Sequence, residues 1–72
     1  MQKVFEVAPR RGAWDVTHNH VGFRLYQSKR EAIRVALLLG RMQPRLGDDA
    51  EIILRDDHGA AMAHRHFSAQ GA

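Results

Sequence analysis

The chain has 72 residues, no cysteine and a formal net charge of +3 at pH 7. A chain of this length forms one domain at most and buries only roughly 60% of the surface of its unfolded form. The absence of cysteine excludes disulfides and thiolate zinc sites. The longest apolar run, residues 35–39, is too short to cross a bilayer. Because no signal-peptide pattern stands at the N-terminus, we expect a soluble cytoplasmic protein.

The charges are unevenly distributed along the chain. Residues 1–45 hold nine lysines and arginines against three acidic residues, whereas residues 46–72 hold two against five. Nine of the eleven basic residues are arginines, whose guanidinium groups suit phosphate and carboxylate recognition. A GC-rich genome produces the same enrichment without selection for binding, so both explanations stay open.

Three short strands are expected in the first half of the chain. Alternating, β-branched and aromatic residues predict them over residues 3–7, 13–17 and 23–26. The first two are separated by a proline- and glycine-bounded turn at residues 9–12, and a loop is expected at residues 19–22.

A helix over residues 29–42 is the clearest local prediction. Ser28 and Glu31 fit a capping box at its start, and Pro44 and Gly47 mark its end. Its expected inward face consists of Ala32, Val35, Ala36, Leu39 and Met42, with Ile33 and Leu38 at the borders. The opposite face is expected to carry Arg30, Arg34 and Arg41, with Leu37 beside them and without a partner in its own chain.

Two strands complete the chain after a polar loop at residues 46–50. They are expected over residues 51–55 and 60–67, joined by a hairpin turn at residues 56–59. The order β-β-β-α-β-β predicts a two-layer α+β fold, in which an antiparallel sheet packs on one helix. We expect a single domain over residues 1–67 and a flexible tail over residues 68–72. The second face of the sheet is then either polar or covered by another subunit.

The same residues resemble a known family. The features are Trp14-x-Val16, an aromatic residue before the Ser28-capped helix with Glu31-Ala32, and a glycine hairpin at Gly59. This pattern, from residue 5 to about residue 62, is similar to small bacterial proteins of the domain-of-unknown-function family 2188. The resemblance implies the fold and a bacterial cytosolic setting, but no activity and no catalytic residues. The chain departs from the family where Arg55 and His58 stand in place of a frequent histidine and aspartate.

Two His-x-His pairs form a candidate metal site. Residues i and i+2 of a strand share one face and lie about 6.6 Å apart, so two imidazoles can reach one ion. Four ligands for zinc or nickel would be available if the two strands were neighbours. The candidate ligands are His18, His20, His64 and His66. The alternative is solvated histidines at the ends of strands; the letters His-Asn-His do not have the spacing of the nuclease motif of that name.

Arginines form the other candidate site, an interface for the backbone of DNA or RNA. They are Arg10, Arg11, Arg24, Arg30, Arg34 and Arg41. The alternative is that the exposed side of a helix is charged in any case, and no helix-turn-helix or aromatic RNA-binding strand accompanies these residues.

No group of residues predicts catalysis. Ser28 is expected to cap the helix, Ser68 lies in the tail, and the isolated glycines at positions 12, 22, 40, 47 and 59 form no phosphate-binding loop. We therefore expect a non-catalytic binding or protein-interaction module without a cofactor or membrane contact. Self-association as a homodimer is one expectation, and weak arginine-mediated nucleic-acid binding is the alternative.

Overall fold

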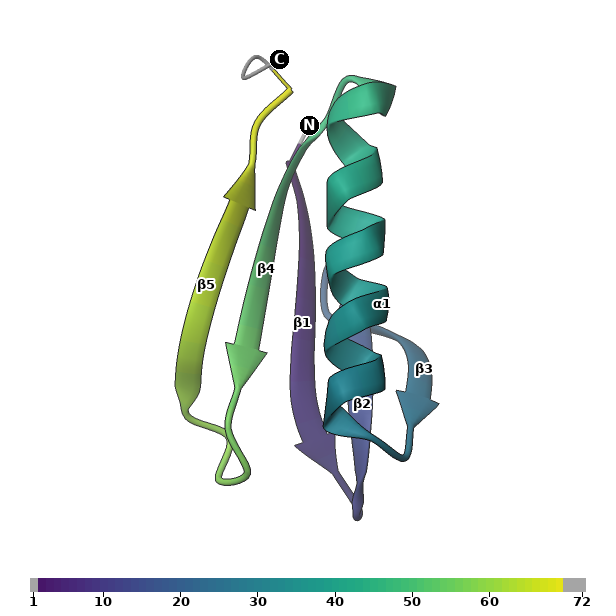
Figure 1. Cartoon of the computed structure of the whole chain (residues 1–72), viewed down its shortest axis with the longest axis vertical. Helices are drawn as coiled ribbons and strands as arrows, with labels where there is room; N and C mark the ends of the chain where they lie inside the picture. Colours follow the sequence, from purple (N-terminus) through teal and green to yellow (C-terminus); the bar gives the residue numbers. More distant parts are fainter. Residues whose placement is uncertain (1, 70–72) are drawn as a thin grey trace.

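The computed structural model describes residues 2–69, apart from the side chain of Phe23. One helix runs along one face of a five-stranded sheet (Figure 1). The elements are β1 (Gln2–Arg10), β2 (Ala13–His18), β3 (Val21–Tyr26), α1 (Lys29–Met42), the 3₁₀ helix η1 (Gln43–Leu46), β4 (Asp49–Arg55) and β5 (Ala61–Phe67). The expected α+β class and the order β-β-β-α-β-β are confirmed, and α1 has the predicted bounds.

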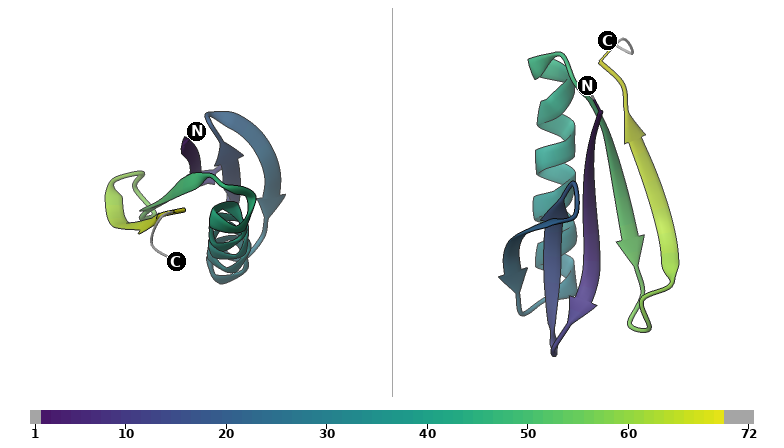
Figure 2. Two further views of the ribbon diagram at one scale, coloured as in Figure 1. Left: turned by 90° about the horizontal axis from the view of Figure 1, so that it is seen from above. Right: turned by 180° about the vertical axis from the view of Figure 1, so that it is seen from behind.

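The sheet is mixed, so the prediction of a purely antiparallel sheet is wrong at one pair of strands. The strand order is β3-β2-β1-β4-β5, and β1 pairs with β4 in parallel while the other pairs are antiparallel. From β1 through β2, β3 and α1 to β4, each element runs opposite to the one before it, so there are four reversals between β1 and β4. Consequently β4 runs in the direction of β1, and it pairs with the free edge of β1 (Figures 1 and 2).

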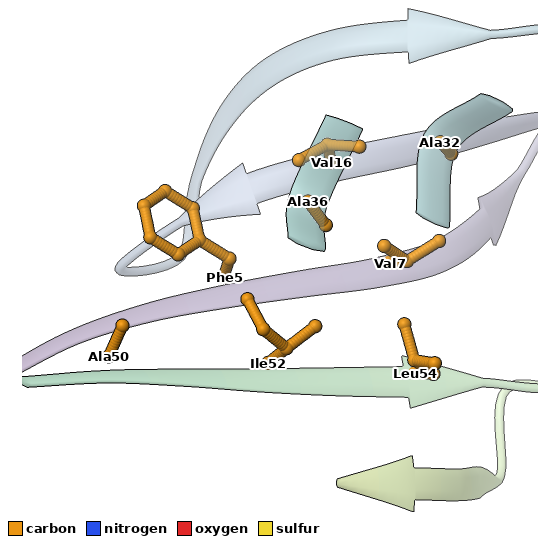
Figure 3. Close-up of a cluster of buried hydrophobic side chains, with 8 residues drawn as sticks. All are labelled: Phe5, Val7, Val16, Ala32, Ala36, Ala50, Ile52 and Leu54. Carbon is orange, nitrogen blue, oxygen red and sulfur yellow. The ribbon is translucent and has the colours of Figure 1, made fainter. Parts of the chain in front are cut away.

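The core lies between α1 and the centre of the sheet. Alternate residues of the strands point toward α1 because successive side chains of a strand lie on opposite faces. Ile52, Val7 and Val16 are the largest fully buried side chains. The complete cluster consists of Phe5, Val7, Val16, Ala32, Ala36, Ala50, Ile52 and Leu54 (Figure 3).

Small residues form the buried centre of α1. The helix begins as predicted, with the Ser28 hydroxyl accepting a hydrogen bond from the Glu31 amide at 3.3 Å. The buried positions are Ala32, Ala36 and Gly40, and their small size allows α1 to lie close to the sheet.

The inward face of α1 is rotated from the expected one by about 60°, at 100° per residue. Leu37 packs against the core, so its predicted lack of a partner in its own chain is wrong. Leu38 and Met42 are instead 56% and 46% exposed. Met42 was expected on the inward face, and Leu38 at its border.

The face of the sheet away from α1 carries charged pairs beside apolar side chains, since Leu25, the register partner of Asp15, and Ile53, that of Glu6, lie on it as well. Glu6 of β1 pairs with Arg55 of β4 across the parallel register. Asp15 of β2 pairs with Arg10. Because Leu25 on this face is 55% exposed, both expected alternatives, a polar surface and a covering subunit, stay predictions.

The connections between elements differ from expectation mainly in length. β1 extends to Arg10, β3 begins at Val21, and η1 continues from the end of α1 to Leu46, the first residue of the expected loop. In the β4–β5 turn, the Asp56 carboxylate accepts hydrogen bonds from the amides of Ala60 and His58. These bonds, first that from Ala60, hold the pKa of Asp56 below its usual value.

The expected flexible tail is only partly described. The amide of Ala69 donates to the Asp49 carboxylate at 2.9 Å, which ties this part of the chain to the start of β4. Residues 70–72 lie outside the described residues.

Candidate nucleic-acid interface

Some arginines are held by carboxylates of the sheet. Arg10 Nη1 lies 3.1 Å from Asp15 Oδ2, and Arg55 Nε donates to Glu6 Oε2. Arg55 Nη1 also donates to the carbonyl oxygen of Gly59 at 3.0 Å. These two guanidinium groups are therefore engaged in the fold.

A second group of arginines lies on the outer side of α1 and η1. We call Arg30, Arg34, Arg41 and Arg45 the arginine row; all four residues are exposed. At 100° and 1.5 Å per residue, the three on α1 fall within an arc of about 40° and extend over about 16 Å. Within residues 2–69, none of the four forms an ion pair with a carboxylate. The row is a strip of uncompensated positive charge.

Arg45 is absent from the predicted arginine interface, because Pro44 and Gly47 mark the expected end of the helix. Proline is compatible with the first turn of a helix, where its missing N–H needs no partner. The chain continues into η1, and the Gln43 side chain donates to the Leu39 carbonyl at 3.0 Å. Pro44, the second residue of η1, is therefore compatible with a further helical turn after α1.

The remaining predicted arginines are distributed over the molecule. Arg24 is the register partner of Val16, which places it on the side of the sheet that carries α1. With Glu31 it lines a cleft of ≈ 530 Å³ between β3 and α1. Arg11 is exposed in the β1–β2 turn, and Arg10 is bound to Asp15. Arg24 therefore lies on the Glu31 and Val35 side of α1, about 100° round the helix from the arginine row, and Arg10 has a structural partner.

Arg10→Ala should lower the free energy of unfolding more than Arg11→Ala. Asp15 is only 7% exposed, so Arg10→Ala leaves a nearly buried carboxylate without its partner. We expect a loss of about 1–2 kcal/mol in the free energy of unfolding. Arg11→Ala should change it by less than about 0.5 kcal/mol, as is usual at exposed positions. Urea unfolding followed by Trp14 fluorescence measures both, and equal losses would contradict a structural role for Arg10.

The histidines lie on two different sides of the sheet. His18 faces α1, and its ring stacks on Phe5 with centroids 4.8 Å apart. Its Nε2 is buried and has no hydrogen-bond partner among the described residues. His20 is exposed in the β2–β3 turn. His64 and His66 of β5 point away from α1, as their register partners in β4 do.

The four histidines therefore do not meet in one chain. β1 and β4 lie between β2, which carries His18, and β5, which carries His64 and His66. His18 also projects from the opposite face of the sheet to His64 and His66. In the part of the chain that the structure describes, no group of three or more histidine, aspartate or glutamate side chains is arranged to hold a metal. The condition on which the predicted four-histidine site depended is not met.

Comparisons with known proteins add no relative. The chain matches no family model, no curated protein and no solved structure. The resemblance to family 2188 thus stays a prediction from short motifs. Over residues 2–69, no helix has the length and apolar character that crossing a membrane requires.

Proposed function

We propose that this chain is a non-catalytic binding module that holds the phosphate backbone of a nucleic acid along the arginine row. The observation that carries the proposal is the contrast between the two groups of arginines. Arg10 and Arg55 of the sheet are paired with carboxylates, whereas the four of the row are exposed and form no ion pair within residues 2–69.

The geometry of the row supports a backbone ligand. Guanidinium groups are planar and donate two parallel hydrogen bonds to phosphate oxygens. A straight strip about 16 Å long on α1 offers one group to each of several successive phosphates. Contacts of this kind carry no sequence information, so binding should be tolerant of sequence and sensitive to salt.

The positions of the hydroxyl and carboxyl groups support the non-catalytic part of the proposal. The Ser28 hydroxyl caps α1, and the Asp56 carboxylate closes the β4–β5 turn. Glu6 and Asp15 are paired with arginines. Each of these groups has a structural partner. The bacterial cytosolic setting implied by family 2188 is part of the same proposal.

Fluorescence anisotropy with labelled 20-mer duplex DNA and single-stranded RNA tests the function. For about four phosphate contacts, the logarithm of the binding constant should fall against log salt with a slope of about −3 to −4. No binding to either probe at about 50 mM salt would contradict the proposal.

Matched variants separate the arginine row from net charge. Arg34→Gln with Arg41→Gln removes two charges of the row and should make the salt slope shallower by about 2. The control is Arg65→Gln with Arg11→Gln, which removes the same net charge at exposed positions outside the row. We expect the control to change the slope by less than about 0.5. Equal effects of the two double variants would overturn the assignment to α1.

A second candidate is an acidic protein segment that docks on the same face. It is favoured by the exposed Leu38 and Met42, which lie one turn apart beside the row. An apolar and acidic helix would complement both features. Leu38→Ser with Met42→Ser should weaken binding of a designed Glu/Leu helical peptide, and should leave binding of DNA unchanged. A loss of DNA binding in this variant would contradict contact through the arginines alone.

A further inference from the structure

β5 is an edge strand that α1 does not cover. Residues 61–66 are exposed on both faces of the sheet, and only one edge of β5 pairs with β4. Figure 2 shows β5 at the edge of the sheet, beyond the strands that α1 covers. An edge of this kind offers unpaired N–H and C=O groups to another strand.

His64 and His66 stand side by side on this edge strand. They are two residues apart, so both project from the face away from α1, about 6.6 Å apart along the backbone. His64 Nε2 lies 2.6 Å from Glu51 Oε2, and the Gln2 side chain donates to the other oxygen of Glu51. When Nε2–H donates to Glu51, Nδ1 of His64 is available as a ligand. This is the arrangement by which carboxylates orient metal-bound imidazoles.

Two adjacent imidazoles are half of the ligand set of a closed zinc site. Zinc in closed sites takes four ligands in a tetrahedron, with Zn–N distances of about 2.0–2.1 Å. The described residues of one chain supply two adjacent imidazoles but no set of three ligands. A second copy of the same strand is the one source that provides two further imidazoles by symmetry.

We propose that two copies of this chain pair through β5 in antiparallel fashion and hold one Zn²⁺, or a similar borderline-soft divalent ion, between their His64 and His66 side chains. With the two-fold axis at Arg65, His64 of each copy lies opposite His66 of the other. Directly opposed residues of antiparallel strands have Cβ atoms about 4.5–5.5 Å apart, which brings all four imidazoles to one face. The resulting interface is isologous, as in most homodimers.

The same register explains why the pairing depends on the metal. It places the two Arg65 residues opposite each other, and like charges at this position destabilise a strand pair. Each Arg65 guanidinium lies 5.6 Å from the centroid of its own Phe67 ring, on the other face of the sheet from the histidines. Without an ion, the charged edge keeps the chains apart. Coordination of the four imidazoles supplies the missing attraction.

The test uses the full chain with ZnCl₂ and, in parallel, NiCl₂. Light scattering after size exclusion should show the mass double on addition of zinc and return to that of the monomer with EDTA. Calorimetry should give one zinc for two chains. His64→Ala and His66→Ala should each abolish the mass change. His20→Ala and His58→Ala, which remove exposed turn histidines, should leave it intact, and circular dichroism verifies the fold of every variant.

Three results would overturn the inference. One zinc per chain with an unchanged mass would assign the ion to a site within one copy. Doubling without added metal, or in the His64→Ala variant, would place the interface elsewhere. An unchanged mass at about 100 µM zinc would exclude the metal bridge, because a four-imidazole zinc site should be saturated at this concentration. Because the arginine row takes no part, loss of nucleic-acid binding would leave each of these readings unaffected.

Discussion

Leu37→Asp is expected to lower the free energy of unfolding by about 2–3 kcal/mol, whereas Leu38→Asp should lower it by less than about 1 kcal/mol. Leu37 packs against the core cluster, so the variant loses apolar burial and sets a carboxylate against the sheet. Leu38 is 56% exposed, and an aspartate there stays in water. For a domain whose whole stability is roughly 4–11 kcal/mol, the first loss is large.

The two substitutions are closely matched. Both replace leucine by aspartate at adjacent interior positions of α1, so the cost in helix propensity is the same. Both also place the carboxylate three or four residues from Arg34 and from Arg41, where an ion pair is equally available. The difference between the variants therefore measures burial alone. Urea unfolding followed by Trp14 fluorescence gives both values, and equal losses would contradict the observed rotation of α1.

This rotation shows how far the pattern of the helix could be predicted. Residues 29–42 were correctly bounded, because the Ser28 cap and the following proline and glycine are local signals. The direction of the inward face was misplaced because the hydrophobic pattern favours Met42 over Leu37, whereas Leu37 packs against the core and Met42 is 46% exposed. The structure instead centres the contact on Ala32, Ala36 and Gly40. Small residues contribute little to a hydrophobic pattern, although they determine how closely a helix approaches a sheet.

Strand adjacency limited the prediction of the candidate site. The existence of each strand followed from alternation and turn residues, but the order β3-β2-β1-β4-β5 depends on which edge β4 joins. No local signal encodes that choice. The two His-x-His pairs were therefore visible in the sequence, whereas their separation by two strands was not.

Pairing of charges was likewise hidden from the sequence. Arg10 and Arg11 are neighbours with the same chemistry, yet Arg10 is bound to Asp15 across the β1–β2 hairpin and Arg11 is exposed. The outward position of Arg30, Arg34 and Arg41 was predicted correctly, because helical periodicity places them on one side. Whether an arginine has a carboxylate partner depends on tertiary contacts between strands.

Gly40→Ala should destabilise the chain by about 1–2 kcal/mol, although alanine is the better helix former. A Cβ at position 40 would lie 2.6 Å from Cδ1 and 3.1 Å from Cγ1 of Ile52, and 3.3 Å from Cδ2 of Phe67. Ile52 is fully buried, and in a close-packed interior its side chain can move away from the new Cβ only by displacing its neighbours. Overpacking costs about 1–3 kcal/mol and exceeds the gain of about 1 kcal/mol in propensity.

A double-mutant cycle isolates this contact. Ile52→Val deletes Cδ1, the atom nearest to the new Cβ, and should alone cost about 0.5–1.5 kcal/mol. In the double variant the added methyl fills the space that Cδ1 leaves, so the combined loss should fall short of the sum by at least about 1 kcal/mol. Arg41→Ala, at the next and exposed position of α1, should change stability by less than about 0.5 kcal/mol. Additive losses in the cycle would mean that α1 does not lie against Ile52 at Gly40. The side of α1 that faces the sheet would then be different, and the arginine row would no longer be assigned to the outer side.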